Sequence, residues 1–228
     1  LQQGRVPDAV ALLEQVVHKY PTDIEALSVL GNIYGQSGQL EAAIHYLQRV
    51  IEISPKDIQA LSNLGVSHMT LGNTDQAREY IERVLELQPD DAGNHFNLGC
   101  ILQEQKRPKD AIRHYRHALQ LEPGSTDILM NLGVALKEMH HNQEAKQTFL
   151  ELAEKAPDNA EVCYNLGIIY NGDGDTENAL ECLTKAIQLR SDYADAHLTL
   201  GNIFLKAERN EEAYIHYEKA ASIEAGSY

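Results

Sequence analysis

The sequence predicts an all-helical protein built from a repeated pair of helices, and three regularities support this fold class. A Leu-Gly dipeptide recurs six times along the 228 residues with a constant spacing of 34. An alanine follows each glycine twelve residues later, and five prolines recur with the same spacing of 34. A fixed period without an insertion is typical of stacked helix–turn–helix units. The six glycines are Gly31, Gly65, Gly99, Gly133, Gly167 and Gly201.

The apolar residues inside each unit follow the period of a helix. In residues 24–34 they are separated by three or four positions, and residues 40–53 repeat this pattern. A glycine inside a helix costs about 1 kcal/mol relative to alanine, so six such glycines need a structural reason. We expect glycine and alanine at matched positions to let the two antiparallel helices of a unit approach closely. Residues of N-capping type stand before five of the first helices. They are Asp23, Asp57, Asp91, Ser125 and Asn159.

The same arithmetic divides the chain into a half-unit and six full units. Residues 1–23 form the half-unit and correspond to a second helix. The full units are 24–57, 58–91, 92–125, 126–159, 160–193 and 194–228. No polar capping helix is evident after the sixth unit, and the half-unit at Leu1 is equally abrupt. We therefore expect a fragment of a longer protein, with self-association through the uncapped ends as the alternative.

The pattern resembles the consensus of the tetratricopeptide-repeat (TPR) family, in which a small residue is eighth and an alanine twentieth in a 34-residue unit. The resemblance covers essentially the whole chain. It implies an all-α solenoid, wound as a right-handed superhelix, whose first helices line a concave face. It also implies a scaffold that binds other proteins and is not itself an enzyme.

An asparagine ladder is predicted on that concave face. In the family, the sixth residue of a unit faces the groove, and four consecutive units have Asn63, Asn97, Asn131 and Asn165 there. An amide offers both donors and an acceptor, so it can bond both the N–H and the C=O of an extended peptide. This resembles the ladder in the superhelix of O-GlcNAc transferase. The alternative is that these amides satisfy neighbouring helices, since asparagine is common at this position.

Apolar side chains are predicted beside the ladder, at the fifth and ninth residues of the units. Such side chains are often core, but the fourth, seventh and eleventh residues already fill the core positions here, so we interpret them as anchors for ligand side chains. The complete predicted peptide-binding set combines these residues with the amides. It comprises Asn32, Asn63, Val66, Phe96, Asn97, Cys100, Met130, Asn131, Val134, Tyr164, Asn165, Ile168 and Asn202.

Charge narrows the choice of partner. The formal net charge is −15 and the pI is about 5.0, which disfavours nucleic acid and anionic membrane surfaces. No apolar run approaches the ~18 residues of a membrane span. We expect a protein or peptide partner that is neutral or basic, and a cytoplasmic location, although a targeting segment could precede Leu1. Acidic residues in the first turns could favour a basic ligand, but they also complement the helix dipole.

No catalytic, cofactor or metal site is predicted. The three cysteines show no CxxC spacing, which argues against a disulfide framework or a zinc site. His114 and His117 could share a metal on one helix, but no third ligand is evident, so we interpret them as surface residues. Residues 171–182 superficially resemble a calcium loop, but Thr176 replaces the needed glycine and Cys182 the final glutamate. We expect Thr176 to cap a helix instead.

Three functional hypotheses follow from the sequence. The first is a protein-interaction scaffold that holds a peptide or partner segment in the groove. The second is the substrate-recruiting arm of a larger enzyme such as a glycosyltransferase, which requires a catalytic domain elsewhere in the natural chain. The third is a self-assembling scaffold whose end faces stack on one another.

Overall fold

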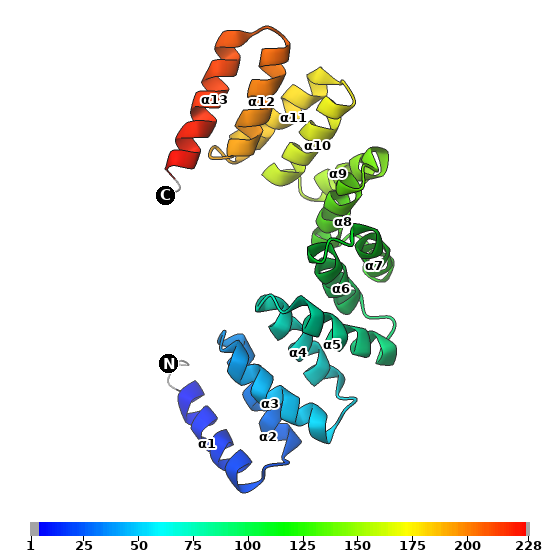
Figure 1. Ribbon diagram of the computed structural model, residues 1–228, viewed down its shortest axis with the longest axis vertical. Helices are drawn as coiled ribbons and strands as arrows, with labels where there is room; N and C mark the ends of the chain where they lie inside the picture. The colour runs from blue at the N-terminus through cyan, green and yellow to red at the C-terminus, as the bar shows by residue number, and fades with distance from the viewer. Residues whose placement is uncertain (1–4, 227–228) are drawn as a thin grey trace. The chain divides into compact units, whose positions relative to one another are not determined.

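The computed structural model describes residues 5–226, and this part of the chain forms thirteen α-helices with no strand (Figure 1). The all-helical fold class predicted from the repeat is therefore confirmed. The chain divides into two compact units, residues 1–121 and residues 122–228, which we call unit 1 and unit 2. None of the described helices is long and apolar enough to cross a bilayer.

Unit 1 contains α1 and three helical hairpins. Within this unit α3 packs against α4, α5 packs against α6, and α1 packs against α2. The first helices also contact one another, α2 with α4 and α4 with α6. The bounds are α1 Arg5–Lys19, α2 Ile24–Gln36, α3 Leu40–Ile53, α4 Ile58–Thr70, α5 Thr74–Leu87, α6 Ala92–Glu104 and α7 Pro108–Leu121.

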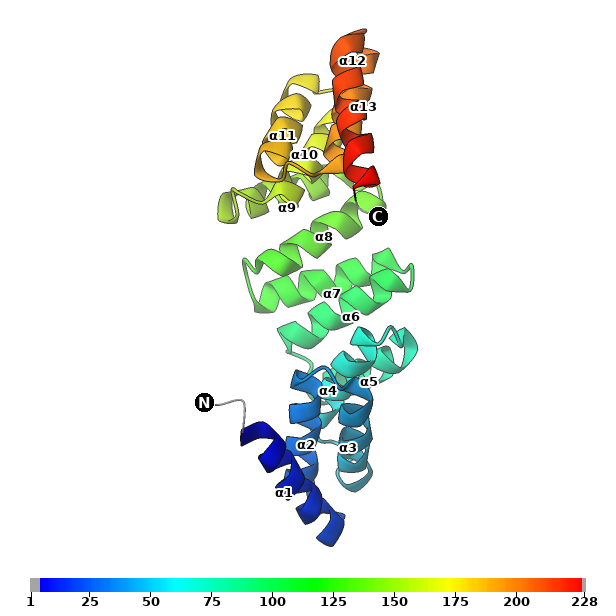
Figure 2. The same cartoon turned by 90° about the vertical axis from the view of Figure 1, so that its left-hand side faces the viewer.

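Unit 2 repeats this organisation with three further hairpins, which Figure 2 shows from a second side. Here α9 packs on α10 and α11 packs on α12, while α10 and α12 also touch. The bounds are α8 Thr126–Glu138, α9 Asn142–Lys155, α10 Ala160–Gly172, α11 Thr176–Leu189, α12 Ala194–Lys206 and α13 Asn210–Ala225.

Side-chain caps fix the start of several first helices. The carboxylates of Asp23 and Asp57 accept hydrogen bonds from backbone N–H groups three residues later, at 3.0 and 2.9 Å, and Asn159 caps α10 in the same way. Ser125 occupies the N-cap position of α8 without a side-chain bond. The cap of α11 is Asp175 and not Thr176 as the sequence suggested, because a carboxylate one residue earlier reaches the N–H of Asn178.

The recurring glycine makes room for one bulky side chain of the partner helix. A Cβ added at Gly31 would lie 2.6 Å from Cγ of Leu47, whereas the carbonyl oxygen of Ala43 would be 3.5 Å away. Gly65 meets Ile81 in the same way. The bulky side chain of the second helix therefore fills the space that the glycine leaves, and the matched alanine is buried as well. This packing accounts for the close approach that we expect between the two helices.

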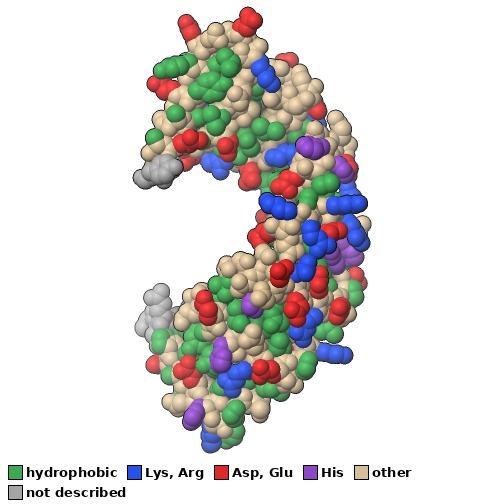
Figure 3. All heavy atoms as spheres, in the orientation of Figure 1, with side chains coloured by type: hydrophobic (Ala, Val, Ile, Leu, Met, Phe, Trp, Pro, Cys, Tyr) green, Lys and Arg blue, Asp and Glu red, His purple; other side chains and the backbone are tan. Residues whose placement is uncertain are grey.

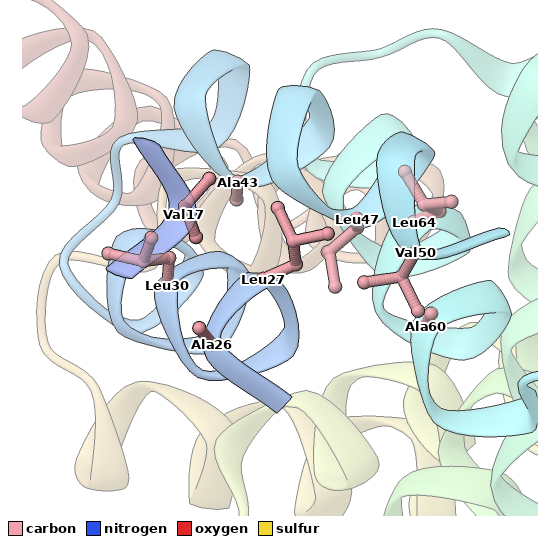
Figure 4. Packing of buried hydrophobic residues seen from close by; sticks show 9 residues of the cluster. All are labelled: Val17, Ala26, Leu27, Leu30, Ala43, Leu47, Val50, Ala60 and Leu64. Atoms are coloured by element: carbon pink, nitrogen blue, oxygen red, sulfur yellow. The ribbon is translucent and has the colours of Figure 1, made fainter. Parts of the chain in front are cut away.

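Each unit has its own apolar core. Figure 4 shows that of unit 1, where Val17 of α1, Leu27 of α2, Leu47 of α3 and Leu64 of α4 converge between the helices. In unit 2 a second cluster forms around Leu183 between α10, α11 and α12. A fully buried leucine stabilises the fold by about 1.5–3 kcal/mol, so stacking of the hairpins is the main stabilising term.

Candidate functional site

A groove of about 770 Å³ opens between α2, α3 and α4 of unit 1. It contains three residues that the sequence predicted as peptide-binding, Asn32, Asn63 and Val66. Although the chain has a net charge of −15, none of the lining residues is charged. They are Gly31, Asn32, Gly35, Gln36, Gly38, Leu40, Leu47, Gln59, Asn63, Val66, Ser67 and Thr70. We call this site the amide groove.

Three amide side chains form a connected row in the amide groove. Nδ2 of Asn63 donates to Oδ1 of Asn32 at 2.6 Å, which links α4 to α2. Nε2 of Gln59 in turn donates to Oδ1 of Asn63 at 3.1 Å. Each amide has two N–H donors and two acceptor lone pairs, so this row leaves further donors and acceptors facing the groove. The structure thus brings Asn63 together with Asn32, the ninth residue of the preceding unit.

Glycine shapes the floor of the amide groove. A Cβ added at Gly35 would meet only Cβ of Ala43, at 3.8 Å, and one added at Gly38 would meet nothing within 4 Å. Gly38 also has a φ of +76°, so a side chain there is disfavoured for the backbone as well. The space that Gly35 leaves is consequently open to a ligand and is not taken by a neighbouring side chain.

The remaining predicted residues of unit 1 lie on α6. Phe96, Asn97 and Cys100 are all partly exposed. The ring of Phe96 lies 5.9 Å from that of the buried Tyr115, measured between centroids. Burial raises the pKa of the Cys100 thiol, so it is protonated at neutral pH. These residues offer a partly apolar surface on α6, which contacts α4 but does not line the amide groove.

In unit 2 the ladder asparagines bond to their own surroundings. Nδ2 of Asn131 donates to the carbonyl of Asp127 at 2.9 Å, and Nδ2 of Asn165 donates to that of Glu161 at 2.9 Å. Oδ1 of Asn165 accepts a hydrogen bond from Nζ of Lys137 on α8. Asn165 is only 2% exposed, and burial lowers the pKa of Lys137. Asn131 therefore bonds within its own helix, whereas Asn165 bonds both within α10 and to Lys137 on the neighbouring helix α8.

The other predicted residues of unit 2 lie on α8, α10 and α12. Met130, Val134, Tyr164 and Ile168 are partly exposed, and Tyr164 packs against Tyr193 with ring centroids 4.8 Å apart. Burial raises the pKa of Tyr193 to about 12. Asn202 is exposed, and its Oδ1 accepts a hydrogen bond from the hydroxyl of Tyr217 at 2.8 Å. The predicted set is therefore divided between the two units.

A buried histidine pair lies in the third hairpin, and the sequence interpretation missed it. Nδ1 of His95, which is 8% exposed, lies 3.0 Å from Nδ1 of His114 on α7. Nε2 of His95 donates to the carbonyl of Pro89 at 2.8 Å, and the ring of His117 stacks on His95 with centroids 4.2 Å apart. His114 is thus half-buried and paired across the hairpin, and it is not a surface residue.

The sixth hairpin contains a second pair of the same kind. Nδ1 of His197, which is 7% exposed, lies 2.9 Å from Nδ1 of His216 on α13. Burial and the neighbouring imidazole lower the pKa of His216, as they do for His114. In both hairpins the histidines are the fourth and twenty-third residues of the repeat. This shared position is the feature of the sequence that could have indicated the two pairs.

Models of the tetratricopeptide repeat match most of the chain. The model described as "Tetratricopeptide repeat" matches residues 36–95 and 102–166, and related models match residues 1–58, 169–208 and 194–226. With the stacked hairpins, these matches define the class of protein as a helical repeat solenoid. The chain belongs to the tetratricopeptide-repeat family.

Solved structures show the same fold at low sequence identity. YrrB, reported as a TPR protein with an unusual peptide-binding site, is 22% identical, with 86% of this chain and 97% of that chain covered and a TM-score of 0.72. MamA is 23% identical, covering 72% and 96%, with a TM-score of 0.67. MamA from Desulfovibrio magneticus RS-1 is 21% identical, covering 74% and 96%, with a TM-score of 0.70. A comparison with proteins of curated function gives no match.

Proposed function

We propose that the chain is a protein-interaction scaffold and that the amide groove of unit 1 holds an extended segment of its partner. The supporting observation is the row formed by Asn32, Asn63 and Gln59 inside a groove without charged lining residues. A peptide backbone presents N–H and C=O groups alternately, and side-chain amides match both. The proposed role is binding, without catalysis by this chain.

The size and lining of the amide groove fit a short peptide segment. Its volume of about 770 Å³ lies within the range of about 300–1,000 Å³ typical of small-ligand sites. Leu40 and Val66 supply apolar surface for a ligand side chain, while Gly35 gives a ligand backbone room to approach. A single segment could therefore bury a side chain and bond its backbone at the same time.

The other predicted residues are proposed as further partner contacts, in each unit separately. In unit 1 these are Phe96, Asn97 and Cys100, all partly exposed. In unit 2 they are Met130, Asn131, Val134, Tyr164, Asn165, Ile168 and Asn202. Partly exposed aromatic and aliphatic side chains suit ligand anchors, whereas Asn165 is buried and would act by positioning Lys137.

The partner's charge mainly affects its association rate. A net charge of −15 attracts a basic partner over long range and raises its association rate at low salt. In Figure 3, acidic and basic side chains are mixed on the visible face of each unit. Because the amide groove has no charged lining residue, we propose that the bound segment itself is neutral and that basic residues flank it.

Selection from a random peptide library tests this function. The chain is used as bait, and the dissociation constant of a selected peptide is then measured for the wild type and for the N32A/N63A double variant. We expect at least about tenfold weaker binding by the double variant, or about 1.4 kcal/mol. N142A, on the exposed start of α9, is the matched control. The proposal fails if no peptide is selected or if the double variant binds as tightly as the control.

A second candidate function is self-association, and exposed apolar side chains on α13 favour it. Tyr214 is 65% exposed and Ile215 is 60% exposed, side by side on one helix. Such neighbouring residues can form a contact between copies. Light scattering after size exclusion, across a range of concentrations, decides the matter. A dimer that the Y214E/I215E variant dissociates supports it, and a monomer at high concentration rejects it.

A further inference from the structure

Two of the six hairpins contain a pair of histidines between their helices. His95 and His114 join α6 to α7 in unit 1, and His197 and His216 join α12 to α13 in unit 2. The second pair follows the first by 102 residues, or three repeats, so the two pairs are equivalent. Neither pair takes part in the amide groove, and the proposed peptide binding does not explain them.

The hydrogen bonds around each pair determine which nitrogens carry protons. Because Nε2 of His95 donates to the carbonyl of Pro89, a neutral His95 presents an unprotonated Nδ1 toward His114. In the sixth hairpin the backbone of Ser191, six residues before His197 as Pro89 is before His95, also acts on the His197 imidazole. In the third hairpin a lone pair on the buried His95 therefore points at a second imidazole nitrogen, and the nitrogens of the second pair are equally close.

The separation of the two nitrogens matches that of two ligands on one ion. Imidazole nitrogens bind ions such as zinc at about 2.0–2.1 Å, so two of them lie about 2.8–3.0 Å apart at a right angle and about 3.3–3.4 Å apart at a tetrahedral angle. The observed Nδ1–Nδ1 separations are 3.0 and 2.9 Å, which match the right angle. The bond from Nε2 of His95 to a backbone carbonyl is also the usual outer contact that orients a metal-binding histidine.

The fourth and twenty-third residues of a repeat change in type together. In the first and second hairpins the fourth and twenty-third residues are leucine and tyrosine, and in the fourth they are Leu129 and Thr148. In the third and sixth hairpins both residues are histidine. Leu27 and Leu61 are fully buried at the fourth position, so packing alone does not require a histidine there.

We propose that each histidine pair is a two-residue chelating site for a divalent transition-metal ion of the class that imidazole prefers, such as Ni²⁺, Zn²⁺ or Cu²⁺. Nδ1 of both rings would bind the ion. The proton on Nδ1 of the second histidine moves to its Nε2, so a neutral pair takes up the ion without releasing a proton. Among residues 5–226 no third His, Cys, Asp or Glu completes either group, so water fills the remaining positions.

The charges around each pair bear on this uptake. Asp110 and Arg113 act on His114 from its own helix, and Asp90 lies 3.9 Å from Nε2 of His117. In the second pair Glu212 acts on His216, and Lys219 acts on His197. Each pair therefore has acidic and basic neighbours, and the net charge of −15 favours a cation over long range.

The stoichiometry of metal uptake tests the proposal. The chain is freed of metal with a chelator, dialysed and titrated with NiCl₂ and ZnCl₂ in a calorimeter at neutral pH. We expect two ions per chain for the wild type, one for H114Q, one for H216Q and none for the double variant. Glutamine retains an N–H that can bond Nδ1 of the buried histidine, so these variants keep the local hydrogen bond while removing a ligand.

Two controls show whether metal uptake is specific to the histidine pairs. H45Q changes an exposed histidine on α3 and should still bind two ions. Far-UV circular dichroism shows that each variant is folded, and the melting temperature should rise with Ni²⁺ only where a pair remains. Lack of uptake by the wild type at millimolar metal would mean that the pairs are hydrogen-bonded only. That result, or uptake unchanged in the double variant, overturns the proposal.

Discussion

Asn63 of unit 1 and Asn165 of unit 2 occupy the same repeat position but make different hydrogen bonds. Asn63 bonds to Asn32 at the edge of an open groove, whereas Asn165 is buried and bonds to Lys137. The twelfth residue of the preceding repeat explains the contrast. It is Gly35 before Asn63 and Lys137 before Asn165. A glycine leaves space for a ligand, and a lysine fills that space and uses the amide's acceptor.

Filling the amide groove should have the largest effect. We expect G35L to fill the space beside Asn63 and to weaken the binding of a selected peptide by about 100-fold, or about 2.7 kcal/mol. Stability should be unchanged or slightly raised, because the new Cβ has room and leucine favours a helix over glycine. Fluorescence anisotropy with a labelled peptide measures the effect.

The matched control for this change is G172L on α10. A Cβ at Gly172 would meet nothing within 4 Å, and the residue belongs to unit 2 and does not line the amide groove. Peptide affinity should stay within about twofold of the wild type. Equal affinity of G35L and G172L would show that the groove is not the binding site.

Replacing the ladder asparagine by alanine in each unit should distinguish a structural role from a binding role. We expect N165A to destabilise the chain by about 2 kcal/mol, because it removes the amide oxygen that accepts the hydrogen bond from the half-buried Nζ of Lys137. N63A should cost less than about 1 kcal/mol, since its partners are amides open to water. Urea unfolding at equal m-value measures both. Equal losses would contradict the assignment of different roles.

Acid should weaken the hairpins that hold the histidine pairs. Burial lowers the pKa of His114, His197 and His216 below the usual 6.5. Just below pH 6.5 the unfolded chain therefore binds more protons than the folded chain does. The stability that the neutral histidines contribute is fully present above pH 6.5 and is lost as pH falls through their pKa values in the folded chain. The melting temperature from pH 7.5 to pH 5 measures it.

H114Q and H216Q provide the comparison for the pH series. Their melting temperatures should depend less on pH than that of the wild type over the same range, because one titrating group is gone. An unchanged slope in the double variant would show that other groups cause the loss.

The turns between paired helices should give the smallest effect. Three of them place Lys106, His140 and Glu208 at φ near +60°, where other turns have glycine. We expect H140G to stabilise unit 2 by about 0.5–1 kcal/mol and G72A to destabilise unit 1 by about 1 kcal/mol. The midpoint of urea unfolding measures both, and a change of opposite sign in either variant would contradict this account.

Much of the fold could be predicted from the sequence because it depends on local periodicity. The spacing of Leu30 and Gly31 and their repeats indicates where helices pack, and the capping residue Asp57 indicates where a helix starts. The groove could be predicted only in part. Asn63 and Asn32 were both expected, but their bond depends on the side chain that the preceding repeat places beside them.

The histidine pairs were missed for a different physical reason. His114 and His117 are three residues apart, so a single-helix pattern groups them, whereas the partner of His114 lies on the facing helix. Such contacts between helices depend on register across the hairpin. Comparing the fourth and twenty-third residues of every repeat would have found His95 and His197.

The side-chain amide resonances of the asparagines provide the most direct test of the central claim. A selected peptide is added to the ¹⁵N-labelled chain, and ¹H–¹⁵N shifts of the assigned side-chain NH₂ groups are recorded. The account predicts that the signals of Asn32 and Asn63 move with saturation, while that of Asn165 does not. Movement of the Asn165 signal with Asn32 and Asn63 unaffected would contradict it.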